Sequence, residues 1–314
     1  MNGPARDMAG GDQDEQVTND EPRLPPTAPP LPPGREIDLP GRGTTFIREL
    51  PGPPAAATVV LLHGWTVTAD LNFFACYEAL SRRFRVITLD HRGHGRGIRA
   101  DEPFTLEACA DDAAALCDVL GIELCIPVGY SMGGPVAQLM WQRHRDLVQG
   151  LVLCATAAKF KDTREEQLHF LSLNGLASLM RLTPGGAQRW LTEQFLQRKG
   201  RSYEAWALEE LARHDLASVV EAGAAIGRFS SVDWLGELDV PVSIVVTMAD
   251  KVVPMRRQLR LFEAIPTAQA YRVDGEHDAV VSRTSNFVPT LVAACSSVVE
   301  RSRNWPAVDR RQVG

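Results

Sequence analysis

The sequence predicts an α/β protein with a mostly parallel sheet that is flanked by helices on both faces. Short apolar runs alternate along the chain with segments whose apolar residues recur at helical spacing. The runs at 124–128 and 151–154 are almost continuously apolar, as expected of strands covered by helices on both faces. Strand patterns stop between about 156 and 236 and return at 242, which indicates a helical insert within one sheet.

The elements follow in chain order from two spacing rules. Strands are expected where short apolar runs are bounded by turn residues, and helices where apolar residues recur every three or four positions. The expected strands span 44–49, 57–62, 84–89, 124–128, 151–154, 242–247 and 269–273. The expected helices span 71–81, 105–120, 135–141, 165–182, 187–197, 203–226, 256–264 and 287–301.

The two ends of the chain fall outside this alternation. Residues 1–34 are polar and then rich in proline, so they cannot bury enough apolar area to offset the entropy of ordering. We expect a disordered tail there, although the proline spacing also allows a polyproline ligand for a partner domain. The expected organisation is a tail at 1–34, core at 35–155, a helical insert at 156–236, core again at 237–303, and a C-terminal tail at 304–314.

Composition and charge argue against several classes of function. With 45% hydrophobic residues and a formal net charge of −6, the 314-residue chain has no basic footprint for nucleic acid or anionic membranes. No run approaches the roughly 20 apolar residues of a membrane span, and the N-terminus lacks a secretory signal pattern. Six cysteines without a Cys-x-x-Cys pair indicate buried core residues in a cytoplasmic, thiol-reducing setting. The oligomeric state stays open.

The segment Gly-Tyr-Ser-Met-Gly-Gly at 129–134 carries the strongest chemical signal. An apolar run precedes it and a helical pattern follows, so the chain would turn sharply from strand to helix at Ser131. Flanking glycines allow the close approach that such a turn requires, and the serine takes a strained conformation. Its hydroxyl would then be exposed beside the unpaired amides of a helix N-terminus, which stabilise an oxyanion. A turn of small residues without chemistry is the alternative.

A serine hydroxyl is nearly inert at neutral pH unless a histidine accepts its proton, and that histidine needs a carboxylate to orient it. Asp250 follows the strand expected at 242–247, and His277 follows the one expected at 269–273. Because parallel strands end at one edge of the sheet, we expect both side chains to meet Ser131 there.

Three other side chains are weaker candidates for these roles. Asp162, after the strand expected at 151–154, is the second choice for the acid. His91 and His94 lie in a loop that we interpret as structural rather than as the source of the base. No spacing of His or Cys indicates a metal site, and the proposed chemistry requires no cofactor.

Four motifs, in order, resemble the α/β-hydrolase family over residues 35 to about 303. The first is Leu61-Leu62-His63-Gly64-Trp65, which is similar to that family's oxyanion loop, and the second is the loop Asp90–Gly95. The third is the strand-to-helix turn at Ser131, called the nucleophile elbow in that family, and the fourth is the chain order serine, acid, histidine. The resemblance implies an α/β-hydrolase fold with an inserted helical cap. It also implies that the backbone N–H groups of Trp65 and Met132 bind the oxyanion, each worth roughly 3 kcal/mol.

The resemblance implies a serine hydrolase that cleaves carboxylic esters of a small or lipid-like molecule. Epoxide hydrolases and haloalkane dehalogenases have aspartate at the position where this chain has Ser131. Carbon–carbon hydrolases often have tryptophan directly after the catalytic histidine, where this chain has Asp278. Carbon–carbon hydrolysis, perhydrolysis, acyl transfer and a non-enzymatic receptor of the same fold stay open. An acyl pocket could be lined by Leu168, Phe170, Leu171, Leu176, Leu179, Met180, Trp190, Leu191, Phe195 and Trp206.

Overall fold

The computed structural model of this protein describes residues 27–183 and 204–305. Most of the tail predicted at 1–34 and most of the one at 304–314 lie outside these residues. So do the helix predicted at 187–197 and three of the residues suggested for the acyl pocket, Trp190, Leu191 and Phe195.

An eight-stranded sheet forms the centre of the described structure, in the order β1-β2-β4-β3-β5-β6-β7-β8. The first two strands pair antiparallel, and the others run parallel to one another. The predicted α/β class with a mostly parallel sheet is therefore confirmed. The strands are β1 (Gly34–Leu39), β2 (Gly43–Leu50), β3 (Thr58–Leu62), β4 (Arg85–Leu89), β5 (Cys125–Tyr130), β6 (Leu151–Cys154), β7 (Val242–Thr247) and β8 (Ala268–Val273).

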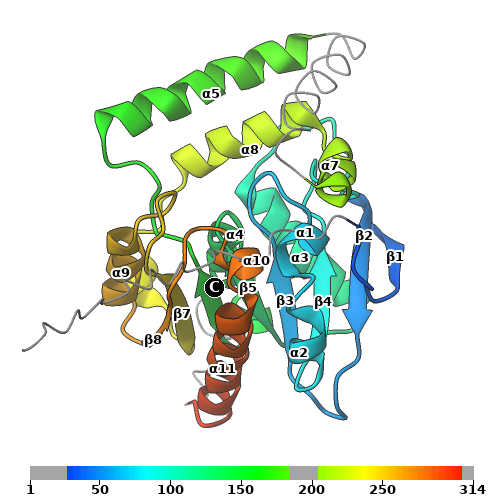
Figure 1. Cartoon of the computed structure of the whole chain (residues 1–314), viewed down its shortest axis with the longest axis vertical. Coiled ribbons are helices and arrows are strands. Elements are labelled where there is room, and N and C mark those ends of the chain that lie inside the picture. Colours follow the sequence, from blue (N-terminus) through cyan, green and yellow to red (C-terminus); the bar gives the residue numbers. More distant parts are fainter. Residues whose placement is uncertain (1–26, 184–203, 306–314) are drawn as a thin grey trace, which may run out of the picture.

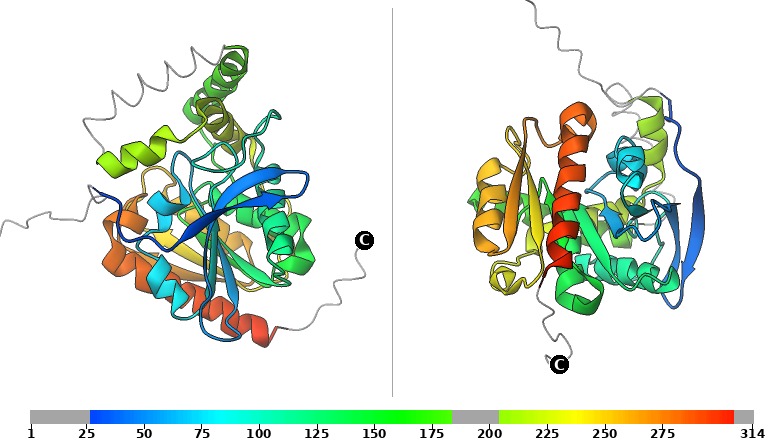
Figure 2. Two further views of the ribbon diagram at one scale, coloured as in Figure 1. Left: turned by 90° about the vertical axis from the view of Figure 1, so that its right-hand side faces the viewer. Right: turned by 90° about the horizontal axis from the view of Figure 1, so that it is seen from below.

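Helices cover both faces of this sheet (Figures 1 and 2). The helices and short 3-10 turns are α1 (Ala69–Phe73), α2 (Tyr77–Ser81), α3 (Leu106–Val119), α4 (Gly133–Arg143), η1 (Arg145–Leu147), α5 (Arg164–Leu182), α7 (Ala205–Ala212), α8 (Leu216–Arg228), η2 (Leu235–Glu237), α9 (Met255–Ala264), α10 (Ala279–Ser282) and α11 (Thr284–Arg303).

Successive residues of the central strands belong to two separate apolar layers, because the side chains of a strand alternate between its two faces. In β3, Val60 and Leu62 pack with α3, α4 and α9 on one face. Val59 and Leu61 pack with α1, α2 and α11 on the other. The strand is buried at every position, which explains why its sequence reads as a continuous apolar run rather than an alternating one.

The segment between β6 and β7 supplies helices α5, α7 and α8, which lie above the sheet in Figure 1. Helices α5 and α8 run side by side there, and Phe170 of α5 packs against Gly227 of α8. A short antiparallel bridge between Lys159 and Ser230 joins the two chain segments that lead into and out of these helices.

Two predicted helices are each divided in the structure. The chain expected at 71–81 forms α1 and α2, with a turn between them. The chain expected at 203–226 forms α7 and α8, because Asp215 caps α8 through bonds to the N–H groups of Ala217 and Ser218. The N–H of Asp215 also donates to the Gly93 carbonyl, which holds this corner against the core. Apolar periodicity continues across both breaks and does not reveal them.

Strand β1 and the residues before it were not expected as ordered elements. The strand pairs with β2 along Gly34–Leu39, and Leu39 is buried in the core. Leu31 packs against the apolar layer on the other face of the sheet, and Arg48 donates to the carbonyl of Pro32. Residues 31–34 thus pack with the folded part, whereas the sequence assigns them to the tail, because backbone pairing does not require an apolar pattern.

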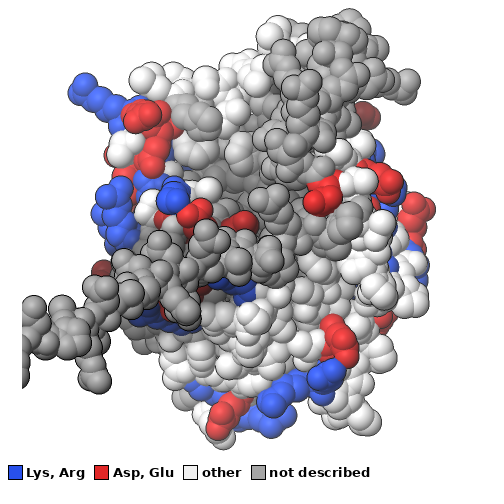
Figure 3. All heavy atoms as spheres, in the orientation of Figure 1, with Lys and Arg blue, Asp and Glu red and all other residues white. Residues whose placement is uncertain are grey.

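The surface and the cysteines agree with the composition. Basic and acidic side chains lie close to one another on the face shown in Figure 3. Within the described ranges, no helix has both the length and the apolar character of a membrane span. All six cysteines are free thiols and buried, as expected of core residues.

Candidate active site

Ser131 lies at the sharp turn between β5 and α4. Its φ of +53° is in the left-handed region, which a residue with a side chain occupies only under strain. A Cβ at Gly133 would lie 2.0 Å from the carbonyl oxygen of Leu62, and one at Gly129 would lie 2.2 Å from that of Gly133. Only glycine fits at these two positions, so the strained turn predicted from the sequence is present.

Asp250, His277 and Ser131 form a continuous row of hydrogen bonds. The Nδ1 atom of His277 lies 2.8 Å from Oδ2 of Asp250, and its Nε2 lies 2.9 Å from Oγ of Ser131. The Asp250 side chain is fully buried, whereas the His277 side chain is 23% exposed. The row therefore runs from the interior of the protein toward solvent.

The carboxylate of Asp250 accepts four further hydrogen bonds from its own surroundings. The N–H groups of Val252 and Val253 donate to Oδ1 at 2.9 and 2.8 Å. The Thr247 hydroxyl donates to Oδ2 at 2.8 Å, and Nε2 of Gln258 lies 3.3 Å from the same oxygen. Such a set of donors fixes the orientation of the carboxylate.

The backbone of His277 is also held in place. The hydroxyl of Tyr130, the residue before Ser131, donates to the carbonyl of His277 at 2.5 Å. The Tyr130 ring packs in turn against Phe287 of α11. The loop that carries the histidine is thereby tied to the strand that carries the serine.

The loop after β3 lies on the other side of Ser131. A Cβ on Gly64 would be 3.4 Å from Cβ of Ser131, so this loop passes directly against the serine. The N–H of Gly64 donates to Oδ1 of Asn72 at 2.8 Å, and Nδ1 of His63 lies 2.8 Å from the Gly64 carbonyl oxygen. Because the peptide bonds are trans, the N–H of Trp65 points away from that fixed carbonyl.

The backbone N–H groups of Trp65 and Met132 belong to the residues that follow Gly64 and Ser131 in the chain. The first follows the fixed Gly64 carbonyl, and the second belongs to the residue that caps α4. Neither N–H group has an acceptor among the described residues. Unpaired amides at the start of a helix favour negative charge, so this side of the serine suits an oxyanion.

Three buried histidines, His63, His91 and His94, and the half-buried His214 support the same loop. The His91 N–H donates to Nε2 of His63, whose ring also lies near the rings of His91 and His94, and His214 lies beside His94. Burial lowers the pKa of His63 to about 3 and that of His214 to about 4. Burial also holds the pKa values of His91 and His94 well below the ordinary range. All four are therefore neutral at pH 7.

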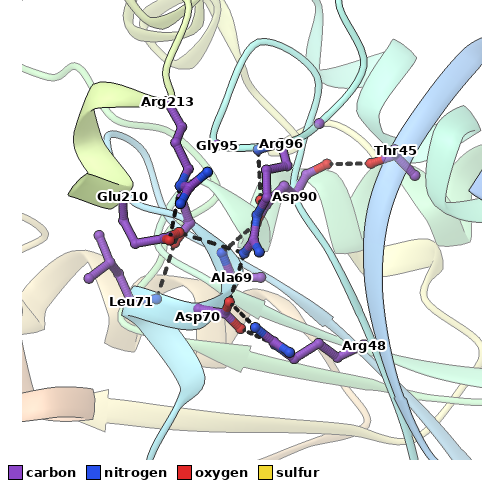
Figure 4. A network of polar contacts seen from close by, with 12 residues as sticks. Thr45, Arg48, Ala69, Asp70, Leu71, Asp90, Gly95, Arg96, Glu210 and Arg213 are labelled. Atoms are coloured by element: carbon purple, nitrogen blue, oxygen red, sulfur yellow. Dashed lines mark hydrogen bonds and ion pairs between the residues drawn. The ribbon is translucent and has the colours of Figure 1, made fainter. Parts of the chain in front are cut away.

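A buried ionic network links α7 to the core beside this loop (Figure 4). Asp70 pairs with Arg48 at 2.6 Å and with Arg96 at 2.7 Å. Glu210 of α7 accepts a hydrogen bond from the Thr68 hydroxyl at 3.0 Å and lies 3.6 Å from Arg96. Burial raises the pKa of Asp90, in the same network, to about 6.

The alternative acid and base candidates lie in other surroundings. The Asp162 carboxylate pairs with Arg257 at 3.2 Å and with Arg260 at 3.0 Å, rather than with His277. His91 and His94 are buried in the histidine group described above. In the described part of the chain, no group of three or more His, Cys, Asp or Glu side chains could hold a metal ion.

The apolar residues suggested for an acyl pocket differ in exposure. Leu168, Leu171, Leu176 and Leu179 are exposed along α5, whereas Met180 and Trp206 are buried. Phe170 packs between α5 and α8.

The residues that hold these groups in place carry no signal in the sequence that marks them as part of a site. Thr247, Gln258 and Asn72 lie within helical or strand patterns and belong to no recognisable motif. Thr247 ends a strand three residues before Asp250, and this closeness in the chain is the one local signal that connects it with the carboxylate. Gln258 is a fully buried polar residue on α9, and only the fold reveals that burial.

Residues 57–213 match a family model described as alpha/beta hydrolase fold. Among curated proteins, the chain is 28% identical over 244 residues to a pimeloyl-[acyl-carrier protein] methyl ester esterase of Chromobacterium violaceum, covering 74% of this chain and 92% of that protein. It is 27% identical over 255 residues to RutD of Agrobacterium fabrum, described there as a candidate carbamate hydrolase, covering 76% of this chain and 93% of that protein.

Solved structures agree with the fold. A thermophilic esterase from Thermogutta terrifontis superposes with a TM-score of 0.67 at 24% identity, over 85% of this chain and 99% of the esterase. At this identity the likeness concerns the fold alone.

Proposed function

Because this chain belongs to the alpha/beta hydrolase fold family, we propose that it is a serine hydrolase that cleaves carboxylic esters of a small or lipid-like molecule. Ser131 is the nucleophile, His277 the general base and acid, and Asp250 the carboxylate that orients the histidine. The backbone N–H groups of Trp65 and Met132 bind the oxyanion.

The row of contacts from Asp250 through His277 to Ser131 is the observation that carries this proposal. With Nε2 of His277 2.9 Å from Oγ of Ser131, the serine proton can pass to the ring as Oγ attacks a carbonyl carbon. Asp250, at 2.8 Å from Nδ1, then stabilises the imidazolium. His277 returns the proton to the leaving alcohol, and a water molecule, deprotonated by the same ring, releases the acyl group.

The oxyanion is expected to form on the side of the serine that faces the Gly64 loop. The N–H groups of Trp65 and Met132 are preorganised there, so they stabilise the developing charge without reorganising during the reaction. No cofactor takes part in this sequence of steps.

Esters are proposed as substrates because one relative is named as a methyl ester esterase. Carbamates are the second candidate, because another relative is described as a candidate carbamate hydrolase and a carbamate carbonyl reacts by the same addition step. We further propose that residues 156–236 form a cap over the site and that apolar residues of this segment contact the acyl group.

Steady-state hydrolysis of p-nitrophenyl esters from acetate to palmitate tests the proposal, with wild type compared with Ser131→Ala. We expect turnover by wild type that disappears in the variant, with a chain-length optimum that reports the size of the acyl site. Circular dichroism of both proteins checks that the substitution leaves the fold intact. A folded wild type that turns over no ester would contradict ester hydrolysis, and a carbamate series and a thermal-shift ligand screen would follow.

A further inference from the structure

The side chain of Trp65 reaches from the loop after β3 to helix α8. Its indole Nε1 donates to the carbonyl oxygen of Val219 at 2.7 Å, and the ring is partly buried against the core. The residue that follows Gly64, whose backbone N–H we propose binds the oxyanion, is therefore attached through its side chain to the segment inserted between β6 and β7.

Gly223 provides the space for this contact. A Cβ at position 223 would lie 2.5 Å from Cζ2 and 2.9 Å from Cη2 of the Trp65 ring. The glycine lies one helical turn after Val219, on the same face of α8. The Trp65 side chain can turn only about two torsions. A rotation that moved the ring away from position 223 would therefore also move Nε1 away from the carbonyl oxygen of Val219.

Helix α8 is itself fixed to the core beside this contact. The N–H of Asp215, which caps the helix, donates to the Gly93 carbonyl at 2.9 Å. Glu221 accepts a hydrogen bond from the N–H of Phe104 at 2.7 Å, and its side chain is buried. The helix is thus a rigid support for the Trp65 ring.

The backbone next to Trp65 requires such a support. Thr66 has a φ of +63°, which is a strained conformation for a β-branched residue. Strained residues persist only where the surrounding contacts determine their conformation. The Trp65 side chain supplies one such contact, and the bond between His63 and the Gly64 carbonyl supplies another on the opposite side.

We propose that the Trp65 side chain and Gly223 of α8 are positioning residues for the oxyanion hole. The helix fixes the indole, the indole fixes the backbone of residues 65 and 66, and the N–H of Trp65 is thereby aimed at the oxyanion. This inference rests on the proposed hydrolase function, and it assigns to the inserted segment a part in the chemical step besides any contact with substrate.

Gly223→Ala tests the proposal, with Gly227→Ala as the matched control on the same helix. Both substitutions add one methyl group to a closely packed site, but at Gly227 the methyl meets Phe170 of α5 instead of Trp65. We expect Gly223→Ala to lower kcat on a p-nitrophenyl ester about tenfold or more with little change in KM, because a misplaced donor weakens only transition-state binding. Gly227→Ala should lower Tm but keep kcat within about twofold.

A third variant separates a positioning role from simple loss of packing. Trp65→Phe removes the two ring atoms closest to the added methyl and leaves only the flexible end of Leu173, at 3.0 Å, against it. Gly223→Ala should therefore have little further effect on kcat in the Trp65→Phe background. Trp65→Phe alone should lower kcat, because it loses the bond to Val219. A smaller loss of kcat from Gly223→Ala in the Trp65→Phe background than in wild type would show that the two positions act through direct contact.

The outcomes distinguish the inference from the function on which it rests. Wild type without esterase or carbamate turnover contradicts the proposed function. An active wild type whose Gly223→Ala variant keeps its kcat contradicts the inference, and so do equal losses of kcat in Gly223→Ala and Gly227→Ala.

Discussion

The two sides of Ser131 are held by different parts of the molecule. On the acid–base side, Asp250 and His277 are fixed by Thr247, Gln258 and Tyr130, all of which belong to the sheet and its flanking helices. On the other side, where we propose that the oxyanion binds, the Gly64–Trp65 loop is fixed by core residues and also by α8 of the inserted segment.

The burial of charge also differs between the two sides. The Asp250 carboxylate is fully buried, and every contact that fixes it comes from within the chain segment 247–277. The Gly64–Trp65 loop is supported by four histidines that burial keeps neutral, one of which, His214, comes from the inserted segment.

The two sides of Ser131 correspond to two requirements of the proposed reaction, proton transfer and oxyanion binding. Proton transfer depends on short distances that the core alone can fix. In the proposed mechanism, oxyanion binding depends on the direction of the Trp65 N–H in a strained loop, and we propose that the segment inserted between β6 and β7 helps to fix it. A change of sequence in the insert can therefore alter the rate of the chemical step while the acid–base row stays intact.

Removal of the carboxylate charge should have the largest effect. Asp250→Asn is expected to lower kcat about 10⁴-fold, because the amide favours the wrong tautomer of His277 and cannot stabilise the imidazolium. Asp162→Asn is the control, since that carboxylate pairs with arginines, and we expect it to keep kcat near wild type. If steady-state kinetics instead show a larger loss of kcat for Asp162→Asn than for Asp250→Asn, the acid is Asp162. The distinction between the two sides of Ser131 would then fail.

Acid should destabilise the protein through the histidines of the oxyanion side. As pH falls below 6.5 the unfolded chain protonates its histidines, whereas the folded chain does so only near pH 4 at His214 and near pH 3 at His63. The unfolded state thus binds more protons, and each buried histidine should cost roughly 2 kcal/mol of folding free energy between pH 7 and pH 5.

Asp90 opposes this loss in part. Its pKa is raised to about 6, so the folded state takes up a proton there and regains roughly 1 kcal/mol over the same range. Urea unfolding at pH 7 and pH 5 measures the net loss. His214→Asn keeps an acceptor for the Gly95 N–H but does not titrate, so its stability should fall less between the two pH values. Equal midpoints for wild type at both pH values would show that the histidines do not control stability.

Loss of one donor to Asp250 should have the smallest effect. Thr247→Val keeps the shape of the side chain but removes the hydroxyl that donates to Oδ2 at 2.8 Å. We expect kcat to fall about tenfold, in line with one hydrogen bond to a charged group. Thr247→Ser should restore most of kcat because it restores the hydroxyl. If the valine variant keeps full activity, the remaining donors are sufficient to orient the carboxylate.

The sequence was enough to predict which three side chains meet at the edge of the sheet, because each one stands in a local pattern. Ser131 follows a strand and precedes a helix, and Asp250 and His277 each follow a strand of the same parallel sheet. The expectation that these three side chains meet at one edge agrees with the distances in the structure, while their catalytic roles stay a prediction.

The groups that hold the reacting residues could not be predicted in the same way. Trp65 and Val219 are 154 positions apart, and the contact depends on the absence of a side chain at Gly223. Gln258 lies on an amphipathic helix, where a polar residue is normally exposed, and its burial depends on how α9 packs against β7. Strand β1 likewise forms through backbone pairing, which leaves little trace in residue type.

Mass spectrometry of the protein after reaction with a fluorophosphonate, combined with residual ester turnover, tests the central claim most directly. We predict one adduct per chain, on Ser131, and loss of turnover in proportion to labelling. Labelling without multiple turnovers in the unlabelled protein would instead favour a receptor that retains the site. A folded protein that hydrolyses esters while Ser131 stays unmodified would contradict the assignment of the nucleophile.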